Sequence, residues 1–184
     1  MTVYIDSREK ARAIKSIVAT FDRRGVKHFS NKLFVGDYQS LDNPRRAIDR
    51  KQNLSEMYQN LCHDHDRFIA ELVRAKEAGI ELIILIEHGP SVKCLEDVIS
   101  WQNPRLEVSP YAWDGKRLYK TMCTVQQKYG VQYEFCSKRE TGARIIELLQ
   151  EGQNEPHILS RRDKKPIENA RPYTDIFPRG KTSQ

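Results

Sequence analysis

The sequence lacks closely paired cysteines, long apolar runs and internal repeats, and each absence removes a class of protein. Four cysteines occur, at positions 62, 94, 123 and 136, and no CxxC pair is among them. This spacing excludes a zinc knuckle and a thioredoxin-like redox pair. The longest apolar stretch, residues 82–86, is far shorter than the roughly 20 residues that span a bilayer. We therefore expect no membrane span.

The first residues also lack the pattern of a secretory signal. Met1–Ile5 is followed at once by the charged segment Asp6–Lys10, with no apolar run of signal length. We therefore expect an intracellular, cytoplasmic protein whose cysteines are free thiols.

The composition that remains is globular and basic. The chain has 184 residues, of which 39% are hydrophobic and 30% charged, which suits one domain with an ordinary core. Lys and Arg outnumber Asp and Glu by 31 to 25, so the net charge is +6. Such an excess suits a polyanionic partner such as nucleic acid, but it also fits a surface charge that only maintains solubility.

Hydrophobic periodicity predicts an α/β domain over residues 1–150. Strands are expected at 3–6, 26–29, 32–38, 47–51, 80–87 and 131–136, with the front strands forming a meander. Helices are expected at 10–24, 54–78, 92–101, 115–128 and 141–150. The continuous apolar run at 80–87 is typical of a central strand covered by helices on both faces. Residues 151–184 are basic, polar and contain several prolines, which predicts a loosely ordered tail.

Acidic residues and a lysine are expected to meet on neighbouring strands. Asp49 and Lys51 are two apart on one strand, so their side chains share a face, and Asp37 ends the strand before it. Asp6 and Glu9 follow the first strand and add carboxylates. Mg²⁺ is typically held by one or two carboxylates and a substrate phosphate, and a nearby lysine can orient water or steady negative charge. The alternative is a surface salt bridge on a hairpin.

Three segments stand in register along the chain: Asp6–Lys10, Val35–Tyr38 and Ile48–Lys51. Together they resemble the nuclease domain of the XPF and Hef family of structure-specific endonucleases, within the PD-(D/E)XK nuclease superfamily. The resemblance covers about residues 1–150 and implies a restriction-endonuclease-like, three-layer α/β fold with a central mixed sheet flanked by helices. It also implies a Mg²⁺- or Mn²⁺-dependent DNA endonuclease of repair, recombination or replication, acting on double-stranded DNA or on branched, flap or fork DNA.

The resemblance assigns roles to individual residues. Asp37, Asp49 and Asp6 would bind the metal, and these three would form the catalytic set together with Lys51 and Glu9. Three further residues match the same motifs and would support the site: Arg8, Arg50 and Gly36.

The family pattern is not fully matched. Asp49 stands where the family has glutamate, and Ser55 stands where it has an aspartate four residues after the lysine. Glu56, the next residue, either replaces that aspartate or serves in a capping box with Asn53 at the start of the following helix.

Other side chains have competing interpretations. Five basic residues would either contact DNA phosphates or be solvated surface charges: Arg45, Arg46, Lys116, Arg117 and Lys120. Those that would stack on bases, or pack in the core, are Trp101, Tyr111 and Trp113. His63 and His65 are two apart on an expected helix and so point to different sides, which favours surface polarity over metal binding.

The function also has alternatives. Members of heterodimeric relatives can be catalytically silent, so this chain is either an enzyme or a DNA-binding or partner subunit. The retained carboxylate–lysine set favours the enzyme. A homodimer or a partner subunit fits the family, while a restriction or mobile-element nuclease would need a recognition segment that the sequence does not show. RNA as a substrate stays open.

Overall fold

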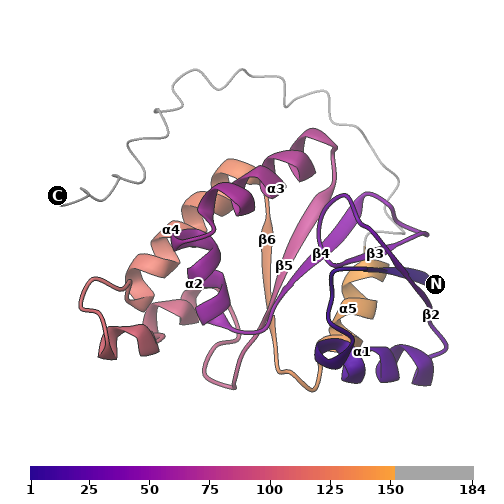
Figure 1. The fold of residues 1–184 in the computed structure, drawn as a ribbon, viewed down its shortest axis with the longest axis horizontal. Helices are drawn as coiled ribbons and strands as arrows, with labels where there is room; N and C mark the ends of the chain where they lie inside the picture. Colours follow the sequence, from indigo (N-terminus) through magenta and orange to yellow (C-terminus); the bar gives the residue numbers. More distant parts are fainter. Residues whose placement is uncertain (152–184) are drawn as a thin grey trace. The chain divides into compact units, whose positions relative to one another are not determined.

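A six-stranded mixed sheet lies between two layers of helices in the computed structural model, which describes residues 1–151 (Figure 1). The strands are β1 (Thr2–Asp6), β2 (Lys27–Asn31), β3 (Tyr38–Ser40), β4 (Arg46–Lys51), β5 (Glu81–Glu87) and β6 (Gln132–Cys136). The α-helices are α1 (Ala11–Arg23), α2 (Leu54–Cys62), α3 (His65–Glu77), α4 (Gly115–Tyr129) and α5 (Thr141–Gln150). Two 3₁₀ helices, η1 (Glu96–Ser100) and η2 (Pro104–Glu107), lie between β5 and α4.

The strand order is β2-β1-β3-β4-β5-β6, and it differs from a simple front meander. β2 pairs in parallel with β1 at the outer edge, whereas β3 pairs antiparallel with the other side of β1 and with β4. β4, β5 and β6 are parallel. The register sets Ile5 opposite Tyr38 and Tyr38 opposite Ile48. The end of β1, the start of β3 and the end of β4 therefore meet at one edge of the sheet.

The expected central strand is confirmed. Side chains of β5 alternate between the two faces of the sheet, and Leu82 to Glu87 are all buried. Ile83 and Leu85 belong to a core shared with α1 and α5, which pack against each other. The other face of the sheet is covered by α2, α3 and α4 (Figure 1). Helices on both faces explain why this segment has no polar alternation.

The helix expected over 54–78 is two helices. α2 ends at Cys62 and α3 begins at His65, because Asp64 has φ −97° and ψ 24° at the N-cap of α3. The Asp64 side chain itself makes no capping hydrogen bond to α3. The helix expected at 92–101 is only the 3₁₀ helix η1. The predicted cap of α2 is confirmed, because the Asn53 side chain accepts from the Glu56 N–H at 2.8 Å.

The strand expected at 32–38 is largely a loop. Leu33 and Val35 are buried, so the alternation that suggested a strand is real. The backbone, however, is used elsewhere: the Leu33 N–H donates to the Asp6 carboxylate, and the Gly36 N–H donates to the Glu71 carboxylate. β3 is therefore only three residues long, and Asp37 lies just before it rather than at a strand end.

Two expectations concern the remaining chain. No helix of residues 1–151 has the length and apolar character needed to cross a membrane. The loosely ordered tail expected at 151–184 lies outside the described residues, apart from Glu151 itself.

Candidate active site

Asp37 is held at the sheet edge by backbone contacts from both of its neighbouring strands. Its carbonyl accepts from the Asp6 N–H at 2.8 Å, and its N–H donates to the Ile48 carbonyl at 2.7 Å. Its Oδ2 accepts from the Arg50 N–H at 2.8 Å. Gly36 precedes it with φ +70°, and a Cβ there would lie 2.8 Å from the Ile48 carbonyl oxygen. Only glycine allows this close approach of the loop to β4.

Asp49 and Lys51 emerge on the same face of β4, as their spacing predicts. Both are buried, and the Lys51 Nζ lies 2.8 Å from each oxygen of the Asp49 carboxylate. The contact at Oδ1 is a hydrogen bond, whereas Oδ2 is paired with the ammonium by charge alone. Lys51 Nζ also lies 5.5 Å from the centre of the Phe68 ring. The lone pairs of this carboxylate that Lys51 does not use can bind a cation.

The electrostatics of the cluster point the same way. Burial, reinforced by the charges of Asp49 and Glu9, raises the pKa of the Asp37 carboxyl well above its usual value. Burial acts against the charged amine of Lys51, but the Asp49 carboxylate raises the pKa of Lys51 above its usual value. Negative charge is therefore crowded around Asp37, and the Lys51 ammonium offsets only part of it. A cation placed among these carboxylates would relieve the rest.

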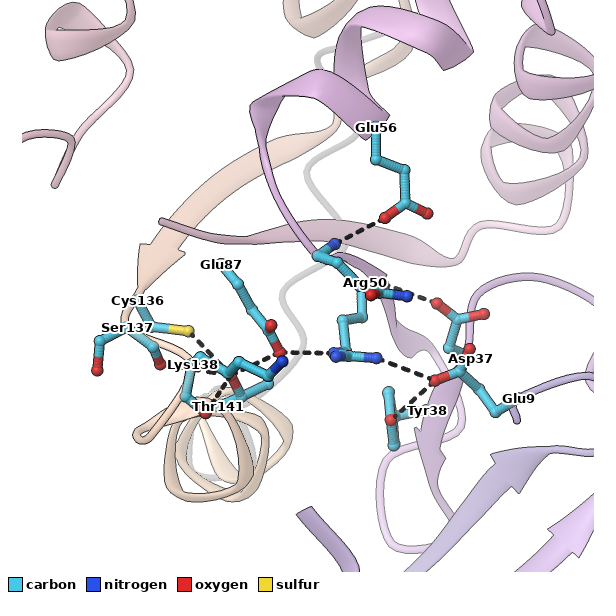
Figure 2. A network of polar contacts seen from close by, with 11 residues as sticks. Glu9, Asp37, Tyr38, Arg50, Glu56, Glu87, Cys136, Ser137, Lys138 and Thr141 are labelled. Atoms are coloured by element: carbon cyan, nitrogen blue, oxygen red, sulfur yellow. Dashed lines mark hydrogen bonds and ion pairs between the residues drawn. The ribbon is translucent and has the colours of Figure 1, made fainter. Parts of the chain in front are cut away.

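Arg50 connects this edge to α5 through a buried network (Figure 2). Its Nε donates to Glu87 Oε1 at 2.7 Å, and its Nη1 lies 3.3 Å from Glu9 Oε2. Glu87 Oε1 also accepts from the Thr141 hydroxyl at 2.9 Å, at the start of α5. The Tyr38 hydroxyl donates to Glu9 at 3.3 Å. Because the Arg50 backbone holds Asp37 while its side chain is held by two glutamates, this network orients the acidic edge.

Asp6 does not join the other carboxylates, contrary to the sequence-based expectation. Its Oδ1 accepts from the Arg8 N–H at 2.8 Å and from Arg8 Nε at 2.7 Å. Its Oδ2 accepts from Arg8 Nη2 at 3.0 Å and from the Leu33 N–H at 2.8 Å. Burial works in the other direction, but these contacts lower the pKa of the Asp6 carboxyl. Both oxygens are occupied by donors, so Asp6 anchors the loop instead of facing a metal.

A hollow of about 230 Å³ lies over the acidic edge. It brings together most of the expected site residues, but Asp6 and Gly36 do not line it. Its walls are Arg8, Glu9, Asp37, Asp49, Arg50, Lys51, Glu56, Asn60, Arg67, Phe68, Glu71 and Arg74.

One wall, contributed by α3, was not expected from the sequence. Arg67, Glu71 and Arg74 recur at helical spacing, which puts them on one face of α3 and above the strands. Glu71 accepts from the Gly36 N–H at 2.9 Å and so ties α3 to the loop of Asp37. The spacing of these charges was a visible signal, but nothing local linked that face to β4.

The donor set fits a divalent cation held partly by its substrate. Among residues 1–151 no three His, Cys, Asp or Glu side chains form a ready metal cluster. Asp37 and Asp49 supply two carboxylates, which is the number that Mg²⁺ typically takes from a protein before phosphate and water complete its shell. Ser55 does not line this hollow, whereas Glu56 does. Glu56 Oε2 accepts from the Gln52 N–H at 2.8 Å, so one of its oxygens is used in the turn that leads into α2.

The side chains proposed to contact DNA lie away from the hollow. Arg46, at the far end of β4, donates to Glu81 and to the carbonyls of Leu148 and Glu151, so it serves the packing of α5. Arg45 is its exposed neighbour. The start of α4 carries three basic residues that do not line the hollow: Lys116, Arg117 and Lys120.

The aromatic residues divide between packing and exposure. Trp113 is buried, with its ring centre 5.9 Å from that of Tyr58 and the Arg117 guanidinium 4.7 Å from its own ring centre. Packing is thus the better interpretation of Trp113. Tyr111 is 88% exposed, which leaves it available for contacts outside the domain.

Comparison with known proteins supports this description. A family model of the ERCC4 domain matches residues 5–149. A solved structure of XPF from Aeropyrum pernix is similar, with 25% identity and a TM-score of 0.58 over 81% of this chain and 63% of that one. A second, XPF from Aeropyrum pernix in complex with DNA, has 21% identity and a TM-score of 0.55, covering 80% and 62%. The chain thus spans less than two thirds of either protein, and no curated protein matches.

The fold expected from the resemblance, an α/β restriction-endonuclease-like domain with a mixed sheet, is confirmed. With the matching motifs and the family model over most of its length, this chain belongs to the ERCC4 domain family and has an XPF-type nuclease domain.

Proposed function

We propose that this domain is a DNA endonuclease that hydrolyses phosphodiester bonds with Mg²⁺ or Mn²⁺. The observation that carries the proposal is that Asp37, Asp49 and Lys51 line one hollow, with Asp49 and Lys51 buried and Asp37 half-buried. Asp37 and Asp49 would hold the cation, which when bound supplies charge stabilisation for the phosphate and a more acidic water.

The protein's own groups divide the remaining work. The Lys51 ammonium, held against Asp49 at 2.8 Å, is placed to orient a water molecule or to steady charge developing on the phosphate. Glu9 keeps Arg50 in place and adds negative charge to the site. Arg8 and Arg67 are largely exposed at the rim, and with Arg74 they offer guanidinium groups to the phosphates on either side of the scissile bond.

The DNA substrate and the cellular process are inferred from the family. The family and the XPF neighbours suggest action on branched, flap or fork DNA during repair, recombination or replication, by a homodimer or with a partner subunit. Ser55 supports a second candidate function, because it stands where relatives have an aspartate and does not line the hollow. A catalytically silent DNA-binding or partner subunit would share the fold but not the cleavage.

A cleavage assay separates these candidates. Purified protein is incubated with end-labelled linear, flap, fork and four-way-junction DNA, and with RNA, in Mg²⁺, Mn²⁺ or chelator. We expect metal-dependent cutting that is lost in Asp37→Asn and Lys51→Ala. Matched controls are Asp22→Asn and Lys15→Ala, which change exposed residues outside the hollow. Tight DNA binding without cutting in either metal would establish the silent subunit instead.

A further inference from the structure

A second and larger hollow, of about 630 Å³, opens beside the candidate active site. It lies between the start of α2 and the 3₁₀ helix η2, in the segment that joins β5 to α4. Its lining residues are Gln52, Asn53, Ser55, Glu56, Tyr58, Gln59, Asn103, Pro104, Arg105 and Val108.

The polar groups of this hollow fall into two kinds. Asn53 and Asn103 are used by the fold: Asn53 caps α2, and Asn103 donates to the Trp113 carbonyl and accepts from the Arg105 N–H. The side-chain amides of Gln52 and Gln59, in contrast, have no hydrogen-bond partner among residues 1–151. The hollow therefore offers uncommitted donors and acceptors on exposed side chains.

The remaining walls indicate the ligand. Pro104 and Val108 provide apolar surface, and Arg105 is the one basic side chain in the lining. Tyr58 adds little surface, because it is only 5% exposed. A phosphate cluster would need several cations, and a purely apolar ligand would leave the amides unpaired. A nucleobase has apolar faces and an edge of alternating donors and acceptors, which is what amide side chains recognise. Arg105 can then hold the phosphate of the same nucleotide.

The two hollows share one wall, Glu56, which lines both. Resting on the proposed function, we propose that this α2–η2 hollow binds one unstacked nucleotide of the DNA strand next to the scissile phosphate. A base inside a duplex is stacked and cannot enter such a hollow. The strand that is cut must therefore offer an unpaired or flipped nucleotide close to the cut, and η2 acts as the element that selects it.

The test measures binding in chelator, so that its readout does not depend on cleavage. The full chain is titrated against fluorescent duplexes with a single-stranded arm, in which each nucleotide around the junction is replaced in turn by an abasic unit. We expect the affinity to fall about tenfold at one or two adjacent positions, the effect of losing one stacked base. In Gln59→Ala and Arg105→Ala, that position-specific loss falls below about twofold, because base and pocket act as one unit.

Matched controls keep the result specific. Gln127→Ala and Arg12→Ala change exposed residues outside the lining and should keep the wild-type abasic profile. A flat abasic profile, a profile unchanged in Gln59→Ala and Arg105→Ala, or no DNA binding at all overturns the inference. Cleavage by the wild type with a flat profile refutes the pocket alone. A sharp profile without cleavage refutes the nuclease proposal and leaves the pocket standing.

Discussion

Asp6, which is buried, and Asp37, which is half-buried, lie at the same edge of the sheet and are joined by a backbone hydrogen bond of 2.8 Å, yet their surroundings are opposite. Donors from Arg8 and Leu33 occupy both oxygens of Asp6 and lower its pKa. Burial and neighbouring negative charges raise the pKa of Asp37. Asp6 is thus built to stabilise the fold, whereas Asp37 is held in an unfavourable state that a bound cation would relieve.

The largest effect that we expect is the loss of cleavage when one of the crowded carboxylates is replaced. Asp37→Asn should lower metal-dependent cleavage by about 10³-fold, since the cation contributes several kcal/mol to transition-state charge stabilisation. The thermal unfolding midpoint should not fall, because the substitution removes a carboxyl group whose charged form is disfavoured by burial and by Asp49 and Glu9. Cleavage kinetics and calorimetry on one preparation check this. A variant that loses stability along with activity would place Asp37 with Asp6 instead.

Disruption of the buried Arg50 network should lower the stability of the fold. Glu87→Ala leaves the buried Arg50 guanidinium with Glu9 alone, so we expect a loss of about 3 kcal/mol in the free energy of unfolding. Denaturant titration measures it. The matched change at an exposed acid, Glu77→Ala, should stay within about 0.5 kcal/mol of the wild type. A Glu87→Ala protein as stable as that control would mean that the network does not hold the edge together.

Asp6 gives the direct counterpart to Asp37. Asp6→Asn removes the charge that Arg8 pairs with and one acceptor for the loop, so we expect about 2 kcal/mol of destabilisation. Because folding lowers the Asp6 pKa, its contribution is present above the unfolded pKa and is lost as the pH falls through the folded pKa. The difference between wild type and variant should therefore shrink in acid, as measured by denaturant titration at several pH values. A difference that grows in acid contradicts the assignment.

The smallest effect expected is at the rim. Arg74→Ala should lower cleavage by about fivefold through weaker DNA binding, with unchanged stability, because an arginine–phosphate contact near solvent is worth roughly 1 kcal/mol. The salt dependence of binding should become shallower. Salt titrations of DNA affinity measure this, with Arg12→Ala as the control on α1. An identical salt slope in both variants would exclude Arg74 from the DNA contact.

The sequence was sufficient for features that depend on local periodicity. The two-residue spacing of Asp49 and Lys51 placed them on one face of β4, and the apolar run of β5 indicated a central strand. Features set by long-range contacts were not accessible. The contact between Arg50 and Glu87 depends on the register of β4 with β5, and Glu71 reaches Gly36 across 35 positions.

The surroundings of Asp6 could not be predicted for a different reason. Its motif position suggested a third metal carboxylate, but a tight turn brings Arg8 back onto it, and the loop closes over it through Leu33. Competition between a metal and neighbouring donors is settled by turn geometry, which the motif alone does not specify.

The central claim is that Asp37 and Asp49 are held together for a divalent cation. The most direct test is the thermal unfolding midpoint of wild type and Asp37→Asn across a Mn²⁺ titration without DNA. A ligand of the folded state stabilises by about 2.7 kcal/mol at a hundredfold excess over its dissociation constant. We predict that Mn²⁺ raises the midpoint of the wild type and leaves that of Asp37→Asn unchanged. An equal rise in both proteins, or none in the wild type, would contradict the account.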